Sequence, residues 1–298
     1  MIPKILHQTG KNATIPPVWQ DAQHSCVALH SPARGWEYRY WTDAASLAFI
    51  RDEYPWFLPT FQGYAHPIQR ADAIRYFALA HYGGVYLDLD DGCARPLDPL
   101  LAYPAWLRKT HPTGISNDAM GAVAGHPFFT RVLRELPRYD RNWGLPYVTV
   151  MGSTGPLFLS VLWRRYSGEG RNVGDGRDGG RIRILFPDEY QGQPWSFFTH
   201  HLGNSWHTVD VDFIFWMARN WVLVTLAGFA IGFGIISIVW FVYTRFAGRS
   251  STFSPLSAAA AASPDVSRWK LDSIRSRFPF WQRASARKEY ELVSRHEV

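Results

Sequence analysis

Residues 67–90, PIQRADAIRYFALAHYGGVYLDLD, carry the strongest structural signal in the chain. The segment up to Tyr82 predicts a helix, because Pro67 suits a first helical turn and apolar side chains recur along it. Gly83-Gly84 would end that helix, and the β-branched and aromatic run Val85-Tyr86-Leu87 then predicts a strand. A helix that returns into a strand through so short a turn indicates an α/β fold.

The sequence before this stretch repeats the alternation. Residues 2–9 predict a short buried strand, and residues 38–41 predict a second strand. Thr42-Asp43 would cap a following helix that reaches Ile50. Strands that alternate with helices in this way predict an α/β sandwich, which we assign to a domain of residues 1–212.

The composition excludes several classes of protein. A chain of 298 residues with 47% hydrophobic and 19% charged content is a folded protein and not a disordered or fibrous one. Cys26 and Cys93 are too few for a disulfide-rich scaffold and lack zinc-binding spacing. The formal net charge is +6, but residues 245–298 hold 10 Lys or Arg against 5 Asp or Glu. A nearly neutral body with a basic tail argues against nucleic-acid binding.

A second strong signal lies near the C-terminus, where residues 221–243 run without a charged side chain. As a helix of about 1.5 Å per residue this segment reaches roughly 34 Å, enough to cross a hydrocarbon core of about 30 Å. Trp221, Trp240 and Tyr243 lie near its ends, where aromatic rings favour the headgroup layer. We therefore predict a transmembrane helix within a membrane-proximal segment, residues 213–246.

The charges around this helix predict its orientation. Arg245, Arg249 and the basic tail follow it, so the positive-inside rule places residues 247–298, largely disordered by composition, in the cytosol. Residues 1–212 would then lie in a lumen. A luminal domain needs a signal segment, and none precedes Ile2. Either an N-terminal anchor is missing from this sequence or the charge rule misleads, and we expect the missing anchor.

Three carboxylates follow the strand predicted at Val85. In an extended segment Asp88 and Asp90 project to the same side, and Asp91 projects to the opposite one. Carboxylates this close repel one another unless a cation neutralises them, and open α/β sheets bind ligands at the carboxyl edge of their strands. On these three residues alone, a solvated acidic turn remains the alternative to a metal site.

The helix before that strand supplies two more candidates. Asp72 and Arg75 are three residues apart on adjoining faces of one turn, and the glycine turn brings the helix back to the same sheet. An Asp that accepts sugar hydroxyls and an Arg that binds phosphate suit a nucleotide-sugar pocket. An exposed ion pair on an amphipathic helix is the alternative.

Together these motifs resemble the DxD-containing glycosyltransferases of family 32, which have the GT-A fold. The resemblance is carried by RADAIRY at 70–76, YGGVYLDLD at 82–90, IPKILHQT at 2–9 and YWTD at 40–43. One branch, the fungal catalytic subunits of inositol-phosphoceramide mannosyltransferase, is the most similar, through LDLDDGC at 87–93, STGPLFLS at 153–160 and FFTHHLGNSWH at 197–207 before a membrane span. The resemblance implies a nucleotide-sugar-binding α/β sandwich with a mixed central sheet, followed by the C-terminal transmembrane helix.

The resemblance also implies roles for single residues. Asp88 would contact the ribose and the donor sugar, and Asp90 would bind Mn²⁺, or another divalent cation, that bridges the donor diphosphate. Asp72 and Arg75 would hold the donor sugar. His207 would complete the metal site, since histidine binds Mn²⁺ beside carboxylates.

Weaker assignments follow for a few other positions. Gln8 and Thr9, at the end of the first strand, would lie near the nucleotide base or ribose. Gly155 would let the backbone approach the donor or the acceptor. His200 and His201 are the alternatives to His207 as metal ligands, and all three histidines could instead be structural.

The function that the resemblance implies is transfer of mannose from GDP-mannose to inositol-phosphoceramide, with retention of configuration, in sphingolipid biosynthesis at the Golgi or endoplasmic-reticulum membrane. A regulatory membrane subunit is an expected partner. A family member with a glycan acceptor or a UDP-sugar donor is the nearest alternative. A non-catalytic membrane subunit is the alternative from another class, and intact Asp72, Arg75, Asp88 and Asp90 argue against it.

Overall fold

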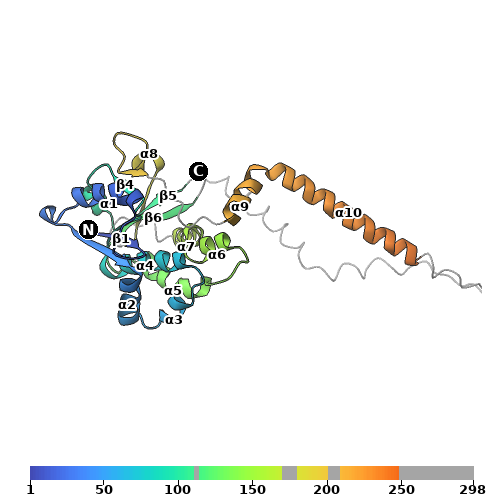
Figure 1. Cartoon of the computed structure of the whole chain (residues 1–298), viewed down its shortest axis with the longest axis horizontal. Helices are drawn as coiled ribbons and strands as arrows, with labels where there is room; N and C mark the ends of the chain where they lie inside the picture. The colour runs from blue at the N-terminus through green and yellow to red at the C-terminus, as the bar shows by residue number, and fades with distance from the viewer. Residues whose placement is uncertain (111–113, 170–179, 201–208, 248–298) are drawn as a thin grey trace, which may run out of the picture. The chain divides into compact units, whose positions relative to one another are not determined.

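A computed structural model of the chain describes residues 1–110, 114–169, 180–200 and 209–247 (Figure 1). The chain divides into two compact units, Met1–Leu226 and Ala227–Val298. The first unit contains every described strand and the helices that pack on them. The second unit continues the last described helix.

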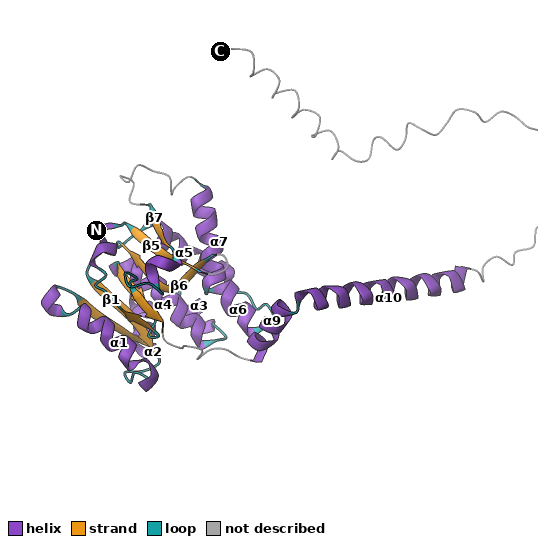
Figure 2. Cartoon of the chain, turned by 90° about the horizontal axis from the view of Figure 1, so that it is seen from above, coloured by secondary structure: helices purple, strands orange, loops and turns teal. Residues whose placement is uncertain are grey.

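A six-stranded sheet forms the centre of the first unit (Figure 2). Its strands lie in the order β2-β1-β3-β6-β5-β7. The pairs β1–β2, β1–β3 and β5–β7 are parallel, whereas β6 is antiparallel to both of its neighbours. The mixed sheet implied by the resemblance is therefore confirmed. The strands are β1 (Ile5–Gly10), β2 (Glu37–Thr42), β3 (Gly84–Leu87), β5 (Ala105–Lys109), β6 (Ile115–Ala122) and β7 (Ile182–Leu185). A smaller sheet pairs β4 (Asp91–Cys93) with β8 (Phe198–His200).

Helices cover both faces of the large sheet. Side chains along each strand point alternately to the two faces, so apolar side chains on both faces pack against helices. Tyr86 and Leu107 pack under α4, α5 and α7, whereas Val85 and Trp106 pack on the opposite side, which α1 covers. The predicted α/β sandwich is thus confirmed. The helices of this unit are α1 (Pro17–Leu29), α2 (Asp43–Glu53), α3 (Leu58–Gly63), α4 (Pro67–Tyr82), α5 (Pro127–Tyr139), α6 (Pro146–Ser153), α7 (Pro156–Gly168), α8 (Pro187–Tyr190) and α9 (Val209–Arg219).

The stretch from α4 into β3 folds as its sequence predicts. The α4 helix begins at Pro67 and ends at Tyr82, and the two glycines that follow have φ values of 68° and 101°. Positive φ values of this size are rare for residues with a side chain. A Cβ atom at Gly84 would also lie only 2.6 Å from the carbonyl oxygen of Ile5, so a glycine is needed where β3 meets β1.

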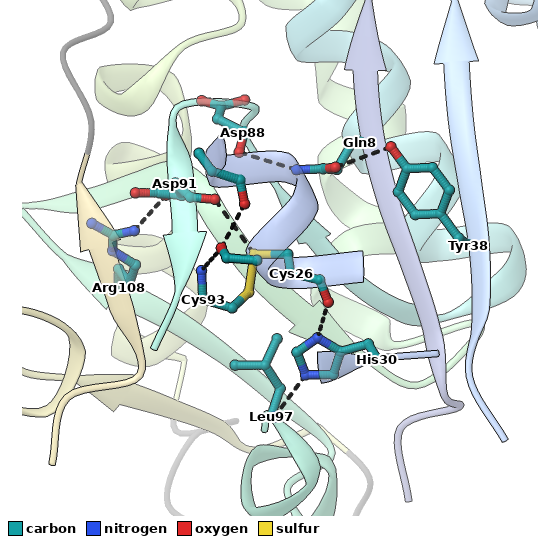
Figure 3. The surroundings of a disulfide bond; sticks show 11 residues. Gln8, Cys26, His30, Tyr38, Asp88, Asp91, Cys93, Leu97 and Arg108 are labelled. Carbon is teal, nitrogen blue, oxygen red and sulfur yellow. Dashed lines mark hydrogen bonds and ion pairs between the residues drawn. A yellow bond between two sulfur atoms is a disulfide. The ribbon is translucent and has the colours of Figure 1, made fainter. Parts of the chain in front are cut away.

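A disulfide joins Cys26 of α1 to Cys93 of β4 (Figure 3). The sequence analysis did not pair these cysteines, which are 67 residues apart. The bond ties α1 to the short strand that directly follows the acidic turn. His30 supports the same region, because its Nδ1 donates to the Cys26 carbonyl at 2.7 Å and its Nε2 accepts from the Leu97 amide at 2.9 Å.

His7 is buried in the centre of the sheet and is held by two hydrogen bonds. The indole nitrogen of Trp41 donates to its Nδ1 at 3.1 Å, so the proton of the neutral ring lies on Nε2, which donates to the Gly83 carbonyl at 2.9 Å. Burial lowers the pKa of His7 from 6.5 to about 4. The ring is therefore neutral at physiological pH and links β1 to the glycine turn.

The last described helix, α10 (Trp221–Ala247), confirms the predicted long apolar segment. Its residues Trp221–Phe246 are long and apolar enough to cross a membrane, and none of the most apolar stretch is buried in the protein. The predicted basic tail lies outside the described residues, apart from its first residue, Ala247.

Loss of the disulfide should lower the stability of the first unit. A cross-link that closes a loop of 67 residues contributes about 4 kcal/mol through chain entropy. We expect Cys26→Ala/Cys93→Ala to reduce the free energy of unfolding by about 2–4 kcal/mol in denaturant titrations. Reductant should shift the unfolding of the wild type in the same direction and leave the double variant unchanged. An unchanged unfolding curve for wild type that has been reduced and then alkylated would contradict the role given to this bond.

Acidification should destabilise the fold through His7. As the pH falls from about 6.5 to about 4, the unfolded chain takes up a proton that the buried ring resists, so stability is lost over that window. At the acid end of this window, His7 should have lowered the free energy of unfolding by about 3 kcal/mol. His126, whose pKa burial also lowers to about 4, adds a similar slope. Urea unfolding of His7→Gln across this pH range should show a shallower slope than the wild type, and parallel curves would refute the assignment.

Candidate active site

A cleft of about 990 Å³ opens at the carboxyl ends of β1 and β3. These strands are parallel, so their carboxyl ends meet at one edge of the sheet, where open α/β sheets bind ligands. The antiparallel β6 brings its amino-terminal end to the same edge. Five of the predicted site residues line the cleft, namely Thr9, Asp72, Arg75, Asp88 and Asp90.

Arg75 lies at the floor of the cleft and is almost fully buried. Its guanidinium contacts Asp72 at 3.1 Å and Asp88 at 3.1 Å, and it donates to the Asn117 carbonyl at 2.7 Å. Burial alone would lower the pKa of Arg75, but the charges of Asp88 and Asp72 raise it well above its ordinary value. The cation is thus permanent, and it ties α4 to the end of β3 and the start of β6.

Asp72 has a hydrogen-bond partner on each of its carboxylate oxygens in addition to Arg75. The Asn117 amide donates to Oδ1 and the Thr154 hydroxyl donates to Oδ2, both at 2.9 Å. Burial raises the pKa of Asp72, while Arg75 and these two donors oppose that rise. The exposed ion pair that the sequence left open as an alternative is therefore excluded, because both partners are buried.

Asn117 and Thr154 are site residues that the sequence analysis missed. Both lie far from Asp72 in the sequence, on β6 and just after α6. A signal existed for Thr154, since it belongs to the STGP motif beside Gly155. Gly155 itself is not among the residues that line the cleft; its neighbour Pro156 lines it, and the Gly155 amide donates to the Val150 carbonyl at 2.9 Å.

Asp88 ends a chain of hydroxyl groups that starts at β1. The Tyr86 hydroxyl donates to Oδ1 of Asp88 at 2.6 Å. Because the proton of Tyr86 is used in that bond, the Thr9 hydroxyl donates to the Tyr86 oxygen at 2.9 Å. Burial raises the pKa of Asp88 to about 7, and the charges of Asp90 and Asp118 add to the rise, whereas Arg75 opposes it. A carboxylate with these neighbours becomes easier to ionise when a cation binds beside it.

The acidic segment is a turn, so the alternation used to predict it is wrong. Residues 88–90 are not extended, and the Asp91 amide donates to the Asp88 carbonyl at 3.2 Å. Asp88 and Asp90 nevertheless face the same cleft. Asp91 instead begins β4 and is buried, with Arg108 at 2.6 Å (Figure 3). Replacement of Asp91 would break a buried ion pair, so we expect Asp91→Asn to destabilise the protein although the side chain does not line the cleft.

Asp118 is a further carboxylate of the cleft, and the sequence analysis missed it. It lines the cleft at the start of β6, and Arg108 lies 3.4 Å from it. Burial raises the pKa of Asp118, and the Arg108 charge opposes that rise. Arg108 therefore sits between Asp91 and Asp118, much as Arg75 sits between Asp72 and Asp88.

Gln8 lies beneath the cleft and does not line it. Its amide nitrogen is 3.4 Å from the Asp88 carbonyl, and its amide oxygen accepts from the Tyr38 hydroxyl at 3.0 Å (Figure 3). The structure thus places Gln8 against the backbone of the acidic turn. His201 and His207 lie outside the described residues. His200 ends β8 and pairs in register with Asp91.

The carboxylates of this cleft fit a hard divalent cation in kind. Asp88, Asp90 and Asp118 all line it, and carboxylate oxygens are the ligands that such cations prefer. Within the described ranges, however, no three His, Cys, Asp or Glu side chains lie close enough together to hold a metal ion on their own. Taken alone, the carboxylates of the described ranges are therefore short of a complete metal site.

Comparison with known proteins agrees with this geometry. Residues 16–106 match the family described as the glycosyltransferase sugar-binding region containing the DXD motif. The chain is 49% identical over 244 residues to the mannosyl phosphorylinositol ceramide synthase CSH1 of Saccharomyces cerevisiae, an alignment that covers 82% of this chain and 63% of that protein.

Two further relatives align over larger shares of their own length. The synthase SUR1 of the same yeast is 46% identical, with 93% of this chain and 68% of that protein covered. Inositol phosphoceramide mannosyltransferase 3 of Schizosaccharomyces pombe is 44% identical, with 91% and 74% covered. The chain therefore belongs to the DXD-motif glycosyltransferase family of the fungal mannosyl phosphorylinositol ceramide synthases.

Proposed function

We propose that this protein transfers mannose from GDP-mannose to the inositol of inositol phosphoceramide. The observation that carries the proposal is the cleft itself, in which Asp72, Arg75, Asp88 and Asp90 meet at the carboxyl edge of the sheet. Relatives that are 44–49% identical are named for this reaction or for its product. The named relatives extend beyond the aligned region, so the donor and the acceptor are assigned to this chain as a proposal.

Different side chains of the cleft have different roles in binding the donor. Asp88 accepts hydrogen bonds from hydroxyl groups of the ribose and the sugar, and Thr9 lies beside it on the nucleotide side. Asp72 holds Arg75 in place, and Arg75 presents a fixed positive charge that orients Asp88. A polar site that is arranged before the substrate binds needs little reorganisation during the reaction.

Asp90 and Asp118 would hold the divalent cation, Mn²⁺ in our proposal, with His207 as a further ligand. When bound, a cation at this place neutralises the charge that develops on the leaving diphosphate. We assign no protein nucleophile. Retention of configuration then follows from attack by the acceptor hydroxyl on the face from which the diphosphate departs.

The lipid acceptor fits a domain that is anchored to a membrane. We propose that α10 spans the bilayer of the Golgi or the endoplasmic reticulum, with the catalytic domain in the lumen and the basic tail in the cytosol. The Cys26–Cys93 disulfide supports the luminal side, because disulfides persist in oxidising compartments. A regulatory membrane subunit remains part of the proposal.

The proposed reaction is tested by product analysis. Membranes that contain the protein should convert GDP-mannose and inositol phosphoceramide into the mannosylated lipid, detected by mass spectrometry. Asp90→Asn keeps the size of the side chain but removes a charge that binds a divalent ion, so transfer should fall by about 10²- to 10³-fold. Asp52→Asn, an exposed position on α2, is the matched control and should retain full activity. Product with only a UDP-sugar or a glycan acceptor would replace the assignment, and no transfer at all would favour a non-catalytic subunit.

Thr154 should matter for the donor although it is buried. Thr154→Val keeps the shape but removes the hydroxyl that donates to Asp72. Loss of one partner of a buried carboxylate costs about 1–3 kcal/mol, so kcat/KM for GDP-mannose should fall roughly 5- to 100-fold. Thr130→Val on α5, which does not line the cleft, should leave this value unchanged. A Thr154→Val protein with wild-type kcat/KM would show that the contact with Asp72 does not shape the donor site.

A further inference from the structure

Six large apolar side chains at the α6 end of the first unit are exposed to solvent. Their exposed fractions lie between 38% and 55%, which is unusual for so many neighbouring aromatic and aliphatic groups. We call this group the apolar patch. Its members are Trp143, Leu145, Leu157, Phe213, Phe215 and Trp216.

The members of the apolar patch are brought together by α6. The ring of Phe215 on α9 lies 6.3 Å from the ring of Tyr147 on α6. A Cβ atom at Gly152 of α6 would lie 3.3 Å from the Trp143 indole nitrogen, so that ring lies over the same helix. Leu145 is the residue directly before α6, and Leu157 is the second residue of α7. The α6 helix contacts both α7 and α9, and both cartoon views place α9 beside α6 (Figures 1 and 2).

The chain leads from this patch directly into the apolar helix α10. The α9 helix ends at Arg219 and α10 begins at Trp221, with only Asn220 between them. Two residues of chain span at most about 7 Å. If α10 crosses a bilayer, the end of α9 must therefore lie in or next to the headgroup layer, whatever angle the two helices make.

We propose that the apolar patch docks on the surface of the lipid bilayer and forms a second membrane contact beside the spanning helix. This inference rests on the membrane anchoring proposed above. Trp and Phe side chains favour the interfacial layer. Arg141 and Arg219, both exposed at the margins of the patch, can pair with anionic headgroups.

A bilayer explains the patch better than a partner protein does. The patch is aromatic with arginines at its margin, which is the composition of an interfacial contact. The connection to α10 also brings a bilayer to this place even when no partner is bound. A membrane protein that covers the patch is the competing occupant, and it would shield these side chains from lipid.

Docking on this side would bring the acceptor to the cleft. Val150 of α6 and Pro156 at the start of α7 line the cleft, whereas Tyr147 of α6 contacts Phe215 of the patch and Leu157 is exposed to solvent. The patch and the cleft are thus separated by about the width of one helix, roughly 10 Å with its side chains. A lipid headgroup could reach the cleft over that distance while the ceramide chains stay in the bilayer.

The disulfide makes it possible to test this docking with a label at a single introduced cysteine. The chain has 2 cysteines, and both are in the disulfide, so one introduced cysteine is the sole free thiol. The full-length protein would be labelled with a fluorophore at Trp143→Cys, Leu157→Cys or Trp216→Cys and reconstituted into vesicles of phosphatidylcholine and phosphatidylinositol. Nitroxide lipids that carry the spin label at the headgroup or deep in the acyl chain then act as quenchers.

Two control positions complete the design. Val18→Cys lies on α1, is 62% exposed, and α1 lies far from α9 in both cartoon views. Ile235→Cys lies in the middle of α10 and is 57% exposed. We expect the headgroup quencher to reduce the fluorescence of the three patch labels at least about twofold more than that of the Val18 label. The deep quencher should act most strongly on the Ile235 label.

The outcomes separate this inference from the proposal on which it rests. Strong deep quenching at position 235 with patch labels no more quenched than the label at 18 would overturn the docking and leave the anchoring intact. Quenching at 216 without quenching at 143 and 157 would also overturn it, because only the end of α9 would then touch lipid. Patch labels shielded from both lipid and aqueous quenchers would assign the patch to a partner protein. An unquenched label at 235 would remove the anchoring and the docking together.

Discussion

The buried cation of Arg75 is the constraint on which the cleft depends. A buried charge is tolerated only when it is paired and hydrogen-bonded, and Arg75 meets this requirement through Asp72, Asp88 and the Asn117 carbonyl. These partners belong to α4, the end of β3 and the start of β6. The glycine turn after α4 is what returns β3 close enough for the pairing. The ion cluster therefore forms only with this chain topology, and it in turn stabilises that topology.

The acidic turn after β3 is held in place from several sides before any ligand arrives. Gln8 contacts its backbone from below, Arg108 pairs with Asp91 at its end, and the disulfide at Cys93 fixes the strand that follows. A turn of carboxylates would otherwise spread apart through mutual repulsion. Such supports lower the entropy that must be lost when the site binds a cation and a donor.

Structural features that depend on neighbouring residues were predicted correctly from the sequence, whereas contacts between residues far apart in the chain were not. The α4 helix, the β3 strand, the Thr42 cap and the apolar helix all follow from short-range propensity and periodicity, and the family resemblance followed from motifs within such segments. The pairing of Cys26 with Cys93 and the contact of Asn117 with Asp72 depend on the tertiary fold, so sequence spacing carried no sign of them. The STGP motif marked the position of Thr154 but did not predict its contact with Asp72. The buried ion pair of Asp91 with Arg108 was not predicted, because a turn replaces the expected extended segment and turns break the two-residue alternation.

The arrangement of charges gives a physical reason for a cation in the cleft. Arg75 and Arg108 are both buried, and each already lies between two carboxylates, Asp72 and Asp88 for the first, Asp91 and Asp118 for the second. The four carboxylates thus outnumber the two arginines. Asp90 also lines the cleft and adds a carboxylate to this group, and the cations Lys11 and Arg70 line the same cleft. A diphosphate brought against these carboxylates would be repelled unless a divalent cation bound between them, so the proposed metal dependence has an electrostatic basis in this cleft.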